Sequence, residues 1–469
     1  MCGVFGIVGT EDISSQLANG LQFLTHRGPE AVGFLTLDDL VDGRFHLLKE
    51  EGLAMYVSRN SKYQKIQGPV GIGHTRYTTM GEGGAKNAQP TVSRTLGIGL
   101  AHNGHVINSD QIQTALEDKG VFFQTDNDGE RILNLFSYYY FNESSPDKKK
   151  NIFFAIEKVM QQVQGSYSAV AIIKGQGLVA FRDPHGIRPL LSGTKEYQGQ
   201  KAAAFASESI ALTQNFFEVK GDVERGNAIF VDKNLEWHQK EIMKKERKFC
   251  PFEYIYFADA FSHLEGRRVN TVRGNAGKLL VKDNPGWQGK FDIVQAVPYS
   301  AIPAAQEIAM ALGVYAKEGM YKYRYGGRIF MSPHQEDREL EAASNFLYFL
   351  ELFEGKKVLL VDDSIVRGTN SKSIISMIKS VAKETHFAST FPEIIGSCFY
   401  GIDTPTIEEL IAPGMSNEEI RQDIGSPDSL VYQKKERIPE AIGCKSCEIC
   451  TGCYTLDYPT SIKPEKVSL

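Results

Sequence analysis

The pattern of hydrophobic and polar positions changes near the middle of the chain. Before about residue 235, short β-type runs broken by glycine dominate, as in 97–101 and 169–173. Apolar residues at helical spacing predict two helices, around 13–24 and 151–163. These elements together predict a mixed α/β layer structure for the first half.

In the second half, buried strands alternate with helices. Four apolar runs carry this pattern: 292–297 and 358–361 as strands, 304–312 and 371–382 as helices. Alternation of this kind predicts a parallel sheet in a doubly wound domain.

A polar, lysine-rich passage separates the two halves and predicts a boundary within 236–262. The predicted division is a first domain over 2–235, a second over 262–440, and a cysteine-rich segment over 441–469.

Composition narrows the class of protein. The chain has 469 residues, which favours two or more domains, and its net charge is −5. That balance excludes nucleic-acid binding driven by bulk charge. No apolar run approaches the roughly 18 residues that span a bilayer, and the first residues lack the features of a secretory signal. We therefore expect a cytoplasmic protein without a membrane segment.

The seven cysteines are unevenly placed. Four of them are spaced by three along one segment, which suggests metal ligands rather than disulfides in a reducing compartment. This C-x2-C-x2-C-x2-C run could by itself bind zinc or an iron–sulfur cluster. The cysteines are Cys2, Cys250, Cys398, Cys444, Cys447, Cys450 and Cys453.

Cys2 becomes the first residue if Met1 is removed. It then carries both a thiol and an α-amine, whose reference pKa of roughly 7.7–8.0 lets it accept the thiol proton. Taken alone, Cys2 is more typical of a buried packing side chain.

The surrounding motifs favour the catalytic interpretation. Cys2 is followed, in order, by His-Arg-Gly-Pro, Gly-His-Thr-Arg, His-Asn-Gly, Asp-Gly-Glu and Arg-Asp-Pro-His-Gly-Ile-Arg-Pro. This series resembles class II glutamine amidotransferases. The resemblance implies a four-layer αββα N-terminal-nucleophile (Ntn) hydrolase domain that releases ammonia from glutamine.

The resemblance also implies residue roles. Cys2 would attack the glutamine side-chain amide, and Asn103 with the Gly104 N–H would hold the developing oxyanion. Arg76 would pair with the substrate α-carboxylate and Asp128 with its α-ammonium.

A second group of residues follows the strand at 358–361. Asp362 and Asp363 come at its carboxyl end, and a glycine-containing loop then leads into a helix. Backbone N–H groups and the hydroxyls of Thr369 and Ser371 can bind a phosphate there. The paired acids can bind ribose hydroxyls or magnesium, although an Asp-Asp pair alone is more typical of a strand-end cap.

The full run resembles the phosphoribosylpyrophosphate (PRPP) loop of type I phosphoribosyltransferases, specifically that of glutamine PRPP amidotransferases. Agreements at 252–258, 327–330 and 399–403 extend the resemblance over the whole chain. It implies that ammonia from glutamine attacks magnesium-bound PRPP to give phosphoribosylamine, the first step of purine synthesis. The substrate-binding positions implied are Asp362, Asp363, Arg367, Gly368, Thr369 and Ser371, and those on the magnesium side are Ser300, Asp362 and Asp363.

Resemblance to the iron–sulfur branch of that family implies a [4Fe–4S] cluster as a second cofactor beside Mg2+. The matching motifs place its ligands at Cys250, Cys398, Cys450 and Cys453. The family resemblance further implies a homo-oligomer with glutamine and PRPP as substrates and purine nucleotides as effectors.

Two departures lie on the PRPP side. Tyr299 stands where the family has an acid, and segment 335–346 keeps Arg338 but adds Glu339 and Glu341 where the family carries several cations. Fewer cations should weaken pyrophosphate binding, unless others such as Lys322 or Arg324 replace them. Two alternatives therefore stay open: a divergent paralogue with an active glutaminase and another acceptor, and a nucleotide-sensing protein with a non-catalytic phosphoribosyl site.

Overall fold

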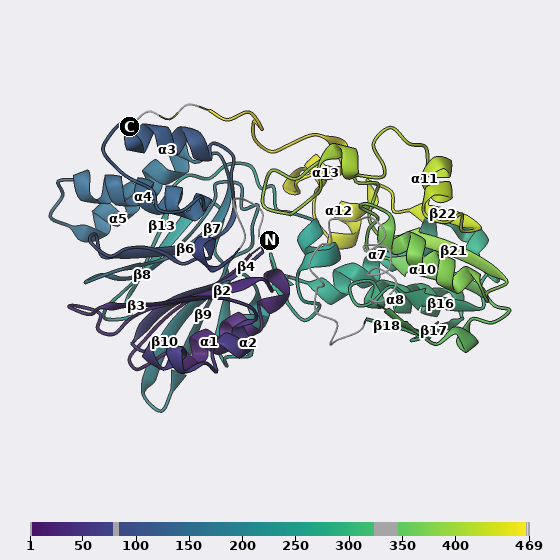
Figure 1. The fold of residues 1–469 in the computed structure, drawn as a ribbon, viewed down its shortest axis with the longest axis horizontal. Coiled ribbons are helices and arrows are strands. Elements are labelled where there is room, and N and C mark those ends of the chain that lie inside the picture. The colour runs from purple at the N-terminus through teal and green to yellow at the C-terminus, as the bar shows by residue number, and fades with distance from the viewer. Residues whose placement is uncertain (1, 78–83, 323–345, 466, 468–469) are drawn as a thin grey trace.

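The computed structural model describes residues 2–77, 84–322, 346–465 and 467. Two units lie side by side in Figure 1, the first coloured purple to teal and the second mostly green to yellow. The predicted phosphoribosyltransferase region forms the second unit, and the polypeptide crosses between the units through the teal segment after β13.

The first unit is built on two antiparallel sheets. β1 lies at the centre of the larger, where every residue from Gly3 to Gly9 is buried. Its seven strands are, in spatial order, β11 (Glu218–Asp222), β9 (Leu191–Tyr197), β10 (Gln200–Ala206), β1 (Gly3–Gly9), β4 (Val70–Arg76), β2 (Ala31–Leu37) and β3 (Phe45–Glu51).

The second sheet of this unit extends beyond the predicted domain end at residue 235. β13 pairs with β12 in register Phe230–His238, so the domain includes one strand more than the sequence indicated. The reason is that β13 is an edge strand exposed to solvent, so its residues are mostly polar and show no hydrophobic pattern. The six strands are, in order, β13 (Trp237–Glu241), β12 (Asn227–Asp232), β8 (Gly177–Arg182), β7 (Gly165–Ile173), β6 (Ile98–Val106) and β5 (Thr91–Ser93).

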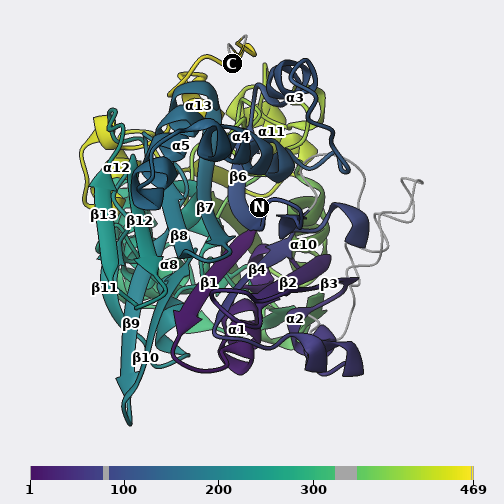
Figure 2. The same cartoon turned by 90° about the vertical axis from the view of Figure 1, so that its left-hand side faces the viewer.

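Helices cover both outer faces, which completes the αββα layering and confirms the predicted fold (Figure 2). Apolar side chains such as Val8, Ile72 and Val170 fill the space between the two sheets. Phe136 and Ile156 lie on two of the helices and pack against the six-stranded sheet. The helices are α1 (Ser14–Gln22), α2 (Ala54–Val57) and α6 (Ser209–Thr213) on one face, and α3 (Ser109–Glu117), α4 (Asp128–Asn142) and α5 (Lys148–Gln162) on the other.

The second unit holds the predicted parallel sheet. β16 and β20 pair in parallel, with Val294 opposite Leu359, and apolar residues pack on both faces of the sheet. Its order is β17 (Tyr315–Lys317), β16 (Ile293–Ala296), β20 (Lys357–Asp362), β21 (Glu384–Ser389) and β22 (Ser429–Tyr432).

Helices flank this sheet, and smaller elements connect it to the first unit. A π-helix (Glu253–Phe257) lies at the junction and precedes the short hairpin of β14 and β15. The remaining elements are β14 (His263–Leu264), β15 (Arg267–Arg268), α7 (Val269–Asp283), α8 (Ile302–Leu312), β18 (Met320–Lys322), β19 (Phe346–Tyr348), α10 (Thr369–Lys379), α11 (Asn417–Asp423), α12 (Arg437–Ile442) and α13 (Gly452–Thr455).

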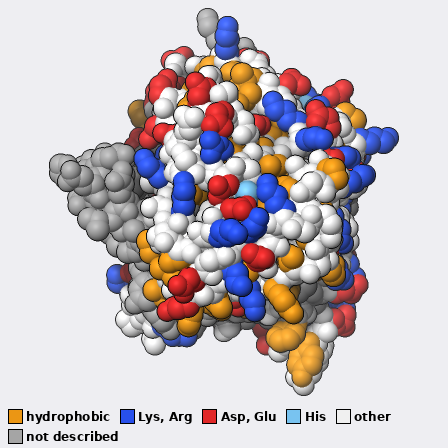
Figure 3. Space-filling model, turned by 90° about the vertical axis from the view of Figure 1, so that its right-hand side faces the viewer, with side chains coloured by type: hydrophobic (Ala, Val, Ile, Leu, Met, Phe, Trp, Pro, Cys, Tyr) orange, Lys and Arg blue, Asp and Glu red, His pale blue; other side chains and the backbone are white. Residues whose placement is uncertain are grey.

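The C-terminal segment returns to the first unit and runs above α3 in Figure 1. The Gln164 side chain donates to the Lys463 carbonyl at 2.9 Å and accepts from the Glu465 N–H at 3.1 Å. On the outer face of the second unit, positive and negative side chains are interleaved (Figure 3). Within the described part of the chain, no helix is both long and apolar enough to cross a bilayer.

Candidate active sites and cysteine centre

The first candidate site is a cavity where β1, β4, β6 and α4 meet. Cys2, Arg76, Gly104 and Asp128 all line it, so the structure brings together residues from four separate motifs. Cys2 directly precedes β1, and its thiol donates to the Tyr77 carbonyl at 3.7 Å. Burial raises the pKa of the Cys2 thiol, which makes a nearby proton acceptor necessary for its activation.

The predicted oxyanion-binding pair lies on β6. Asn103 is fully buried, and neither atom of its carboxamide has a hydrogen-bond partner among the described residues. An unpaired buried amide is costly unless a ligand completes it. Asn103 does not itself line the cavity, but its neighbour Gly104 does, and the Gly104 backbone is so crowded that a Cβ there would lie 2.0 Å from the Ser166 carbonyl oxygen.

Asp128 begins α4 and is held as a carboxylate. It accepts from the Val106 N–H at 3.1 Å and lies 3.4 Å from His102 Nε2. Burial opposes its charge, but His102, His105 and the Val106 N–H outweigh burial and hold the Asp128 pKa below its usual value. The site therefore contains a fixed anion, as the α-ammonium of an amino acid requires.

Five residues that line this cavity were not predicted as site residues from the sequence: His74, Tyr77, Gln89, His102 and Asn127. The Gln89 side-chain oxygen accepts from the His102 N–H at 2.7 Å, and its amide lies 3.1 Å from His102 Nδ1. Gln89 thus positions His102, which in turn faces Asp128. A lone glutamine followed by proline gave no signal in the sequence.

The second candidate site lies at the carboxyl end of β20. Asp363 accepts from the Ser364 hydroxyl at 2.7 Å and from the Ser300 hydroxyl, so the structure joins the predicted magnesium-side residues. Burial and mutual repulsion raise the pKa of Asp362, and burial likewise raises that of Asp363. Asp363 is buried and Asp362 is partly buried, and the Asp363 N–H donates to the Asp362 carboxylate at 2.8 Å. Two neighbouring carboxylates of this kind form a site that a divalent cation would stabilise.

The loop after these acids leads into α10 as predicted. Gly368 has φ 77° and immediately precedes Thr369, the first residue of the helix, while Ser371 is buried within its first turn. Arg367 is half exposed and lies 3.5 Å from Glu409, so its predicted substrate contact stays a prediction.

Of the two sequence departures on the PRPP side, the structure describes the one at Tyr299. Tyr299 is half exposed, and its hydroxyl donates to the Lys322 carbonyl at 3.3 Å. Segment 335–346 lies outside the described residues except for Phe346, as do Arg324 and the motif at 327–330.

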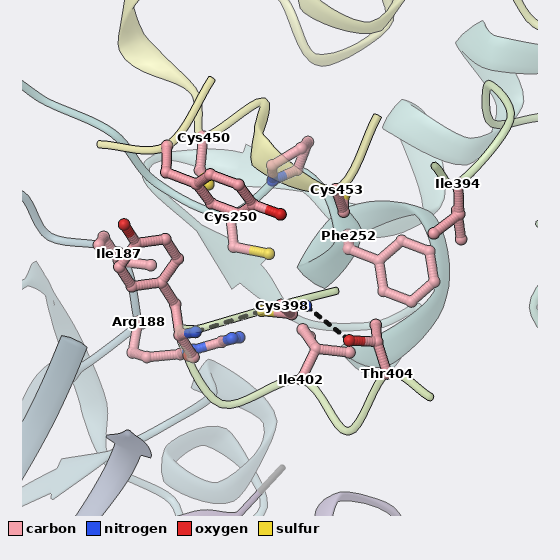
Figure 4. A pocket seen from close by; sticks show the side chains of 13 residues that line it. Ile187, Arg188, Cys250, Phe252, Ile394, Cys398, Ile402, Thr404, Cys450 and Cys453 are labelled. Atoms are coloured by element: carbon pink, nitrogen blue, oxygen red, sulfur yellow. Dashed lines mark hydrogen bonds between the residues drawn. The ribbon is translucent and has the colours of Figure 1, made fainter. Parts of the chain in front are cut away.

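The third candidate site gathers four cysteines from three distant segments. Cys250, Cys398, Cys450 and Cys453 line one cavity (Figure 4). All four are free thiols, and burial raises the pKa of Cys250 to about 11 and raises those of Cys450 and Cys453. Neutral thiols form only weak hydrogen bonds with one another in an apolar cavity. A metal ion, in contrast, would bind them as thiolates.

The geometry favours the dispersed set over the local run. Cys444 and Cys447 are not among the residues that line this cavity, and Cys447 is exposed. Among the described residues, no three cysteine sulfurs lie mutually within 4.8 Å of one another. Sulfurs around a single zinc ion would lie about 3.8 Å apart at ordinary Zn–S bond lengths. Every trio of described cysteines therefore includes at least one sulfur–sulfur separation larger than this.

Known proteins are similar to this chain along its whole length. A family model described as "Glutamine amidotransferase domain" matches residues 74–214. Among curated proteins, the amidophosphoribosyltransferase of Methanothermobacter thermautotrophicus is 38% identical over 100% of this chain and 96% of its own length. That of Escherichia coli is 37% identical, covering 97% and 92%.

Solved structures show the same likeness. The glutamine PRPP amidotransferase of Bacillus subtilis, complexed with ADP and GMP, superposes with a TM-score of 0.87 at 34% identity, over 99% of each chain. A second structure, described as the allosteric regulatory enzyme of purine biosynthesis, gives 0.87 at 35% identity, covering 99% of this chain and 98% of that one. The likeness therefore extends over both units.

Proposed function

The chain belongs to the amidophosphoribosyltransferase family, and from this membership we propose which of its residues carry out each part of the reaction. The enzyme hydrolyses glutamine and transfers the ammonia to PRPP, which gives 5-phosphoribosylamine, pyrophosphate and glutamate. Full-length similarity does not favour the divergent paralogue or the nucleotide sensor.

In the first unit, Cys2 Sγ attacks the side-chain carbonyl carbon of glutamine. Once Met1 is removed, the α-amine of Cys2 accepts the thiol proton and later delivers it to the leaving ammonia. Asn103 and the Gly104 N–H stabilise the oxyanion, and water then hydrolyses the thioester to glutamate. The unpaired Asn103 carboxamide is the observation that carries this assignment.

Arg76 and Asp128 orient the substrate by its α-groups. Both line the cavity that contains Cys2. The guanidinium matches a carboxylate with two parallel hydrogen bonds, and the depressed pKa of Asp128 keeps it charged for the ammonium. This pair would select an amino acid over a simple amide.

In the second unit, Thr369, Ser371 and the backbone after Gly368 bind the 5′-phosphate at the start of α10. Asp362 and Asp363, with Ser300, would hold the ribose hydroxyls and Mg2+. When bound, magnesium supplies positive charge that stabilises the departing pyrophosphate. The buried, like-charged carboxylates support this assignment because they need a cation to be stable as anions.

Cys250, Cys398, Cys450 and Cys453 are the proposed ligands of a [4Fe–4S] cluster. Four thiolates are the usual ligand set of such a cluster. The cluster would join segments at 250, 398 and 450–453 and so stabilise the contact between the units.

One assay tests the function. Purified protein is incubated anaerobically with glutamine, PRPP and magnesium, and glutamate and pyrophosphate are measured. Formation of both products in equal amounts is expected. Glutamate alone would indicate another acceptor, and neither product, with nucleotide binding retained, would indicate a sensor.

The B. subtilis neighbour binds ADP and GMP, and we propose purine nucleotides as effectors here. A homo-oligomeric state and a cytoplasmic location stay predictions.

A further inference from the structure

The backbone of the nucleophile is bound by a buried arginine that the mechanism above does not use. Arg27 is fully buried at the end of a 3₁₀ turn, and its Nε donates to the Cys2 carbonyl at 2.9 Å. The Cys2 side chain extends from this backbone into the cavity, so a displacement of Arg27 displaces the reacting sulfur.

Arg27 is itself held by a carboxylate from the junction between the units. Glu253, the first residue of the π-helix, accepts from Arg27 NH2 at 2.8 Å and from Arg27 NH1 at 3.0 Å. Arg27 NH1 also donates to Glu208 at 2.5 Å. Because Glu253 is only 2% exposed, solvent does not weaken this bidentate pair.

The same carboxylate binds a second arginine, which faces the cysteines. Glu253 Oε1 accepts from Arg188 NH1 at 3.0 Å, and Arg188 lines the cysteine cavity (Figure 4). Arg188 Nε donates to the Tyr400 carbonyl at 2.6 Å, and the Tyr400 N–H in turn donates to Cys398 Sγ at 3.3 Å. An unbroken chain of short contacts therefore joins a proposed cluster ligand to the Cys2 carbonyl.

We propose that Glu253 is a positioning residue that couples the four-cysteine centre to the reactivity of Cys2. This inference rests on the proposed cluster. Four cluster-bound thiolates place negative charge next to Arg188, which is then shared between the centre and Glu253. When the cluster is lost, Arg188 no longer faces the thiolates and is drawn toward Glu253, the 398–400 segment loses its anchor, and Glu253 holds Arg27 less well.

A double-mutant cycle on the full chain tests the coupling. Cys453→Ser removes a proposed cluster ligand that is not itself part of the chain of contacts. Glu253→Gln removes the negative charge that Arg27 and Arg188 share, while keeping the shape of the side chain. The readout is the rate at which iodoacetamide alkylates Cys2, measured by mass spectrometry of the N-terminal peptide, together with the iron content of each protein.

We expect Cys453→Ser to slow Cys2 alkylation about tenfold in the parent, within the range usual for coupled sites. The same substitution should change the rate less than twofold in the Glu253→Gln background. An equal effect in both backgrounds, or iron loss without any change in the parent, would overturn the coupling alone. A parent protein that binds no iron would overturn the proposed cluster and the coupling with it.

Two further variants keep the test decisive. Glu265→Gln is the matched control, since Glu265 is also a junction carboxylate between two arginines, Arg182 at 2.6 Å and Arg247 at 3.0 Å, but contacts neither Cys2 nor a cysteine of the centre. It should retain the tenfold effect. If Glu253→Gln does not fold, Arg188→Lys serves instead, because one ammonium cannot span Glu253 and the Tyr400 carbonyl as the guanidinium does, and it too should abolish the coupling.

Discussion

Gly401 of the second unit packs directly on the backbone of Gly104 in the first. A Cβ added at Gly401 would lie 2.9 Å from the carbonyl carbon and oxygen of Gly104. Gly104 is the residue whose N–H we assign to the oxyanion, and Gly401 lies three residues after the proposed cluster ligand Cys398. One residue of the proposed glutaminase site, Gly104, is therefore packed directly against the phosphoribosyltransferase half.

The contact predicts that Gly401→Ala impairs glutamine hydrolysis. The new methyl group must displace Gly104, and the φ of 93° at this position adds strain of about 1 kcal/mol or more. We expect the kcat for glutamine hydrolysis to fall by up to about 10²-fold, the cost of losing one oxyanion donor. Gly414→Ala is the matched control, because Gly414 has φ 77° but no atom near its Cβ position. An equal loss in both variants would show that strain, not the contact, matters.

Cys2→Ala should abolish glutaminase activity. It removes the only sulfur among the described residues that line the first cavity, while Cys250 and the other proposed cluster ligands are untouched, so the iron content should equal that of the parent. Ammonia supplied as a salt should still react with PRPP in this variant. Residual glutamine hydrolysis would exclude Cys2 as the nucleophile.

The cysteine centre predicts which thiols are needed for cluster assembly and which are not. Protein purified without air should contain about four irons and absorb broadly in the visible region. Cys250→Ser or Cys398→Ser should prevent cluster assembly, and Cys444→Ser or Cys447→Ser should not. The opposite pattern of iron contents would assign the metal to the local C-terminal run.

Lys49 predicts a dependence of stability on pH. Burial lowers its pKa to about 8, with Arg76 contributing and Glu130 opposing. The folded-state pKa lies below the unfolded value of about 10.4. The positive charge on Lys49 therefore destabilises the folded state. This penalty has its full size below about pH 8 and decreases as the pH rises toward about 10.4. Lys49→Met should therefore raise the free energy of unfolding by about 1 kcal/mol at pH 7, after allowance for its partial exposure.

Urea unfolding at pH 7 and pH 9.5 measures this effect. The advantage of Lys49→Met over the parent should shrink at the higher pH. An advantage that grows with pH would have the wrong sign for a destabilised cation.

The hydrophobic pattern predicted a mixed α/β layer structure and the parallel sheet, because apolar runs are local signals. The αββα layering and the grouping of Cys2, Arg76, Gly104 and Asp128 were implied by the resemblance of the ordered motifs to class II glutamine amidotransferases. The sequence prediction missed β13, which is a polar edge strand with no hydrophobic pattern.

Long-range polar contacts also escaped prediction. Glu253 was noticed only as part of a motif, although it joins Arg27 and Arg188 from distant segments. Gln89 likewise gains its role only from the fold, which places it against His102. Which charges pair across an interface depends on packing that a single sequence does not display.

The final prediction concerns how much the pyrophosphate group adds to PRPP binding. Contacts to the ribose and 5′-phosphate depend on Asp362, Asp363 and the start of α10, which are formed in the structure. Tyr299, where the family has an acid, instead donates to a backbone carbonyl at 3.3 Å. Each charge-assisted hydrogen bond to pyrophosphate is worth about 1.5–3 kcal/mol, so a site with few cations gains little from that group.

Calorimetric titration of PRPP and ribose 5-phosphate, each with magnesium, measures the difference. We expect PRPP to bind less than about 100-fold more tightly, corresponding to the loss of all but one or two such bonds. Asn345→Lys combined with Ser344→Arg, both outside the described residues, should increase the preference by restoring positive charge. Asp363→Asn should weaken both ligands alike, because it acts on the ribose and magnesium side. Tight, PRPP-selective binding by the parent would mean that other cations, such as Lys322, meet the pyrophosphate instead.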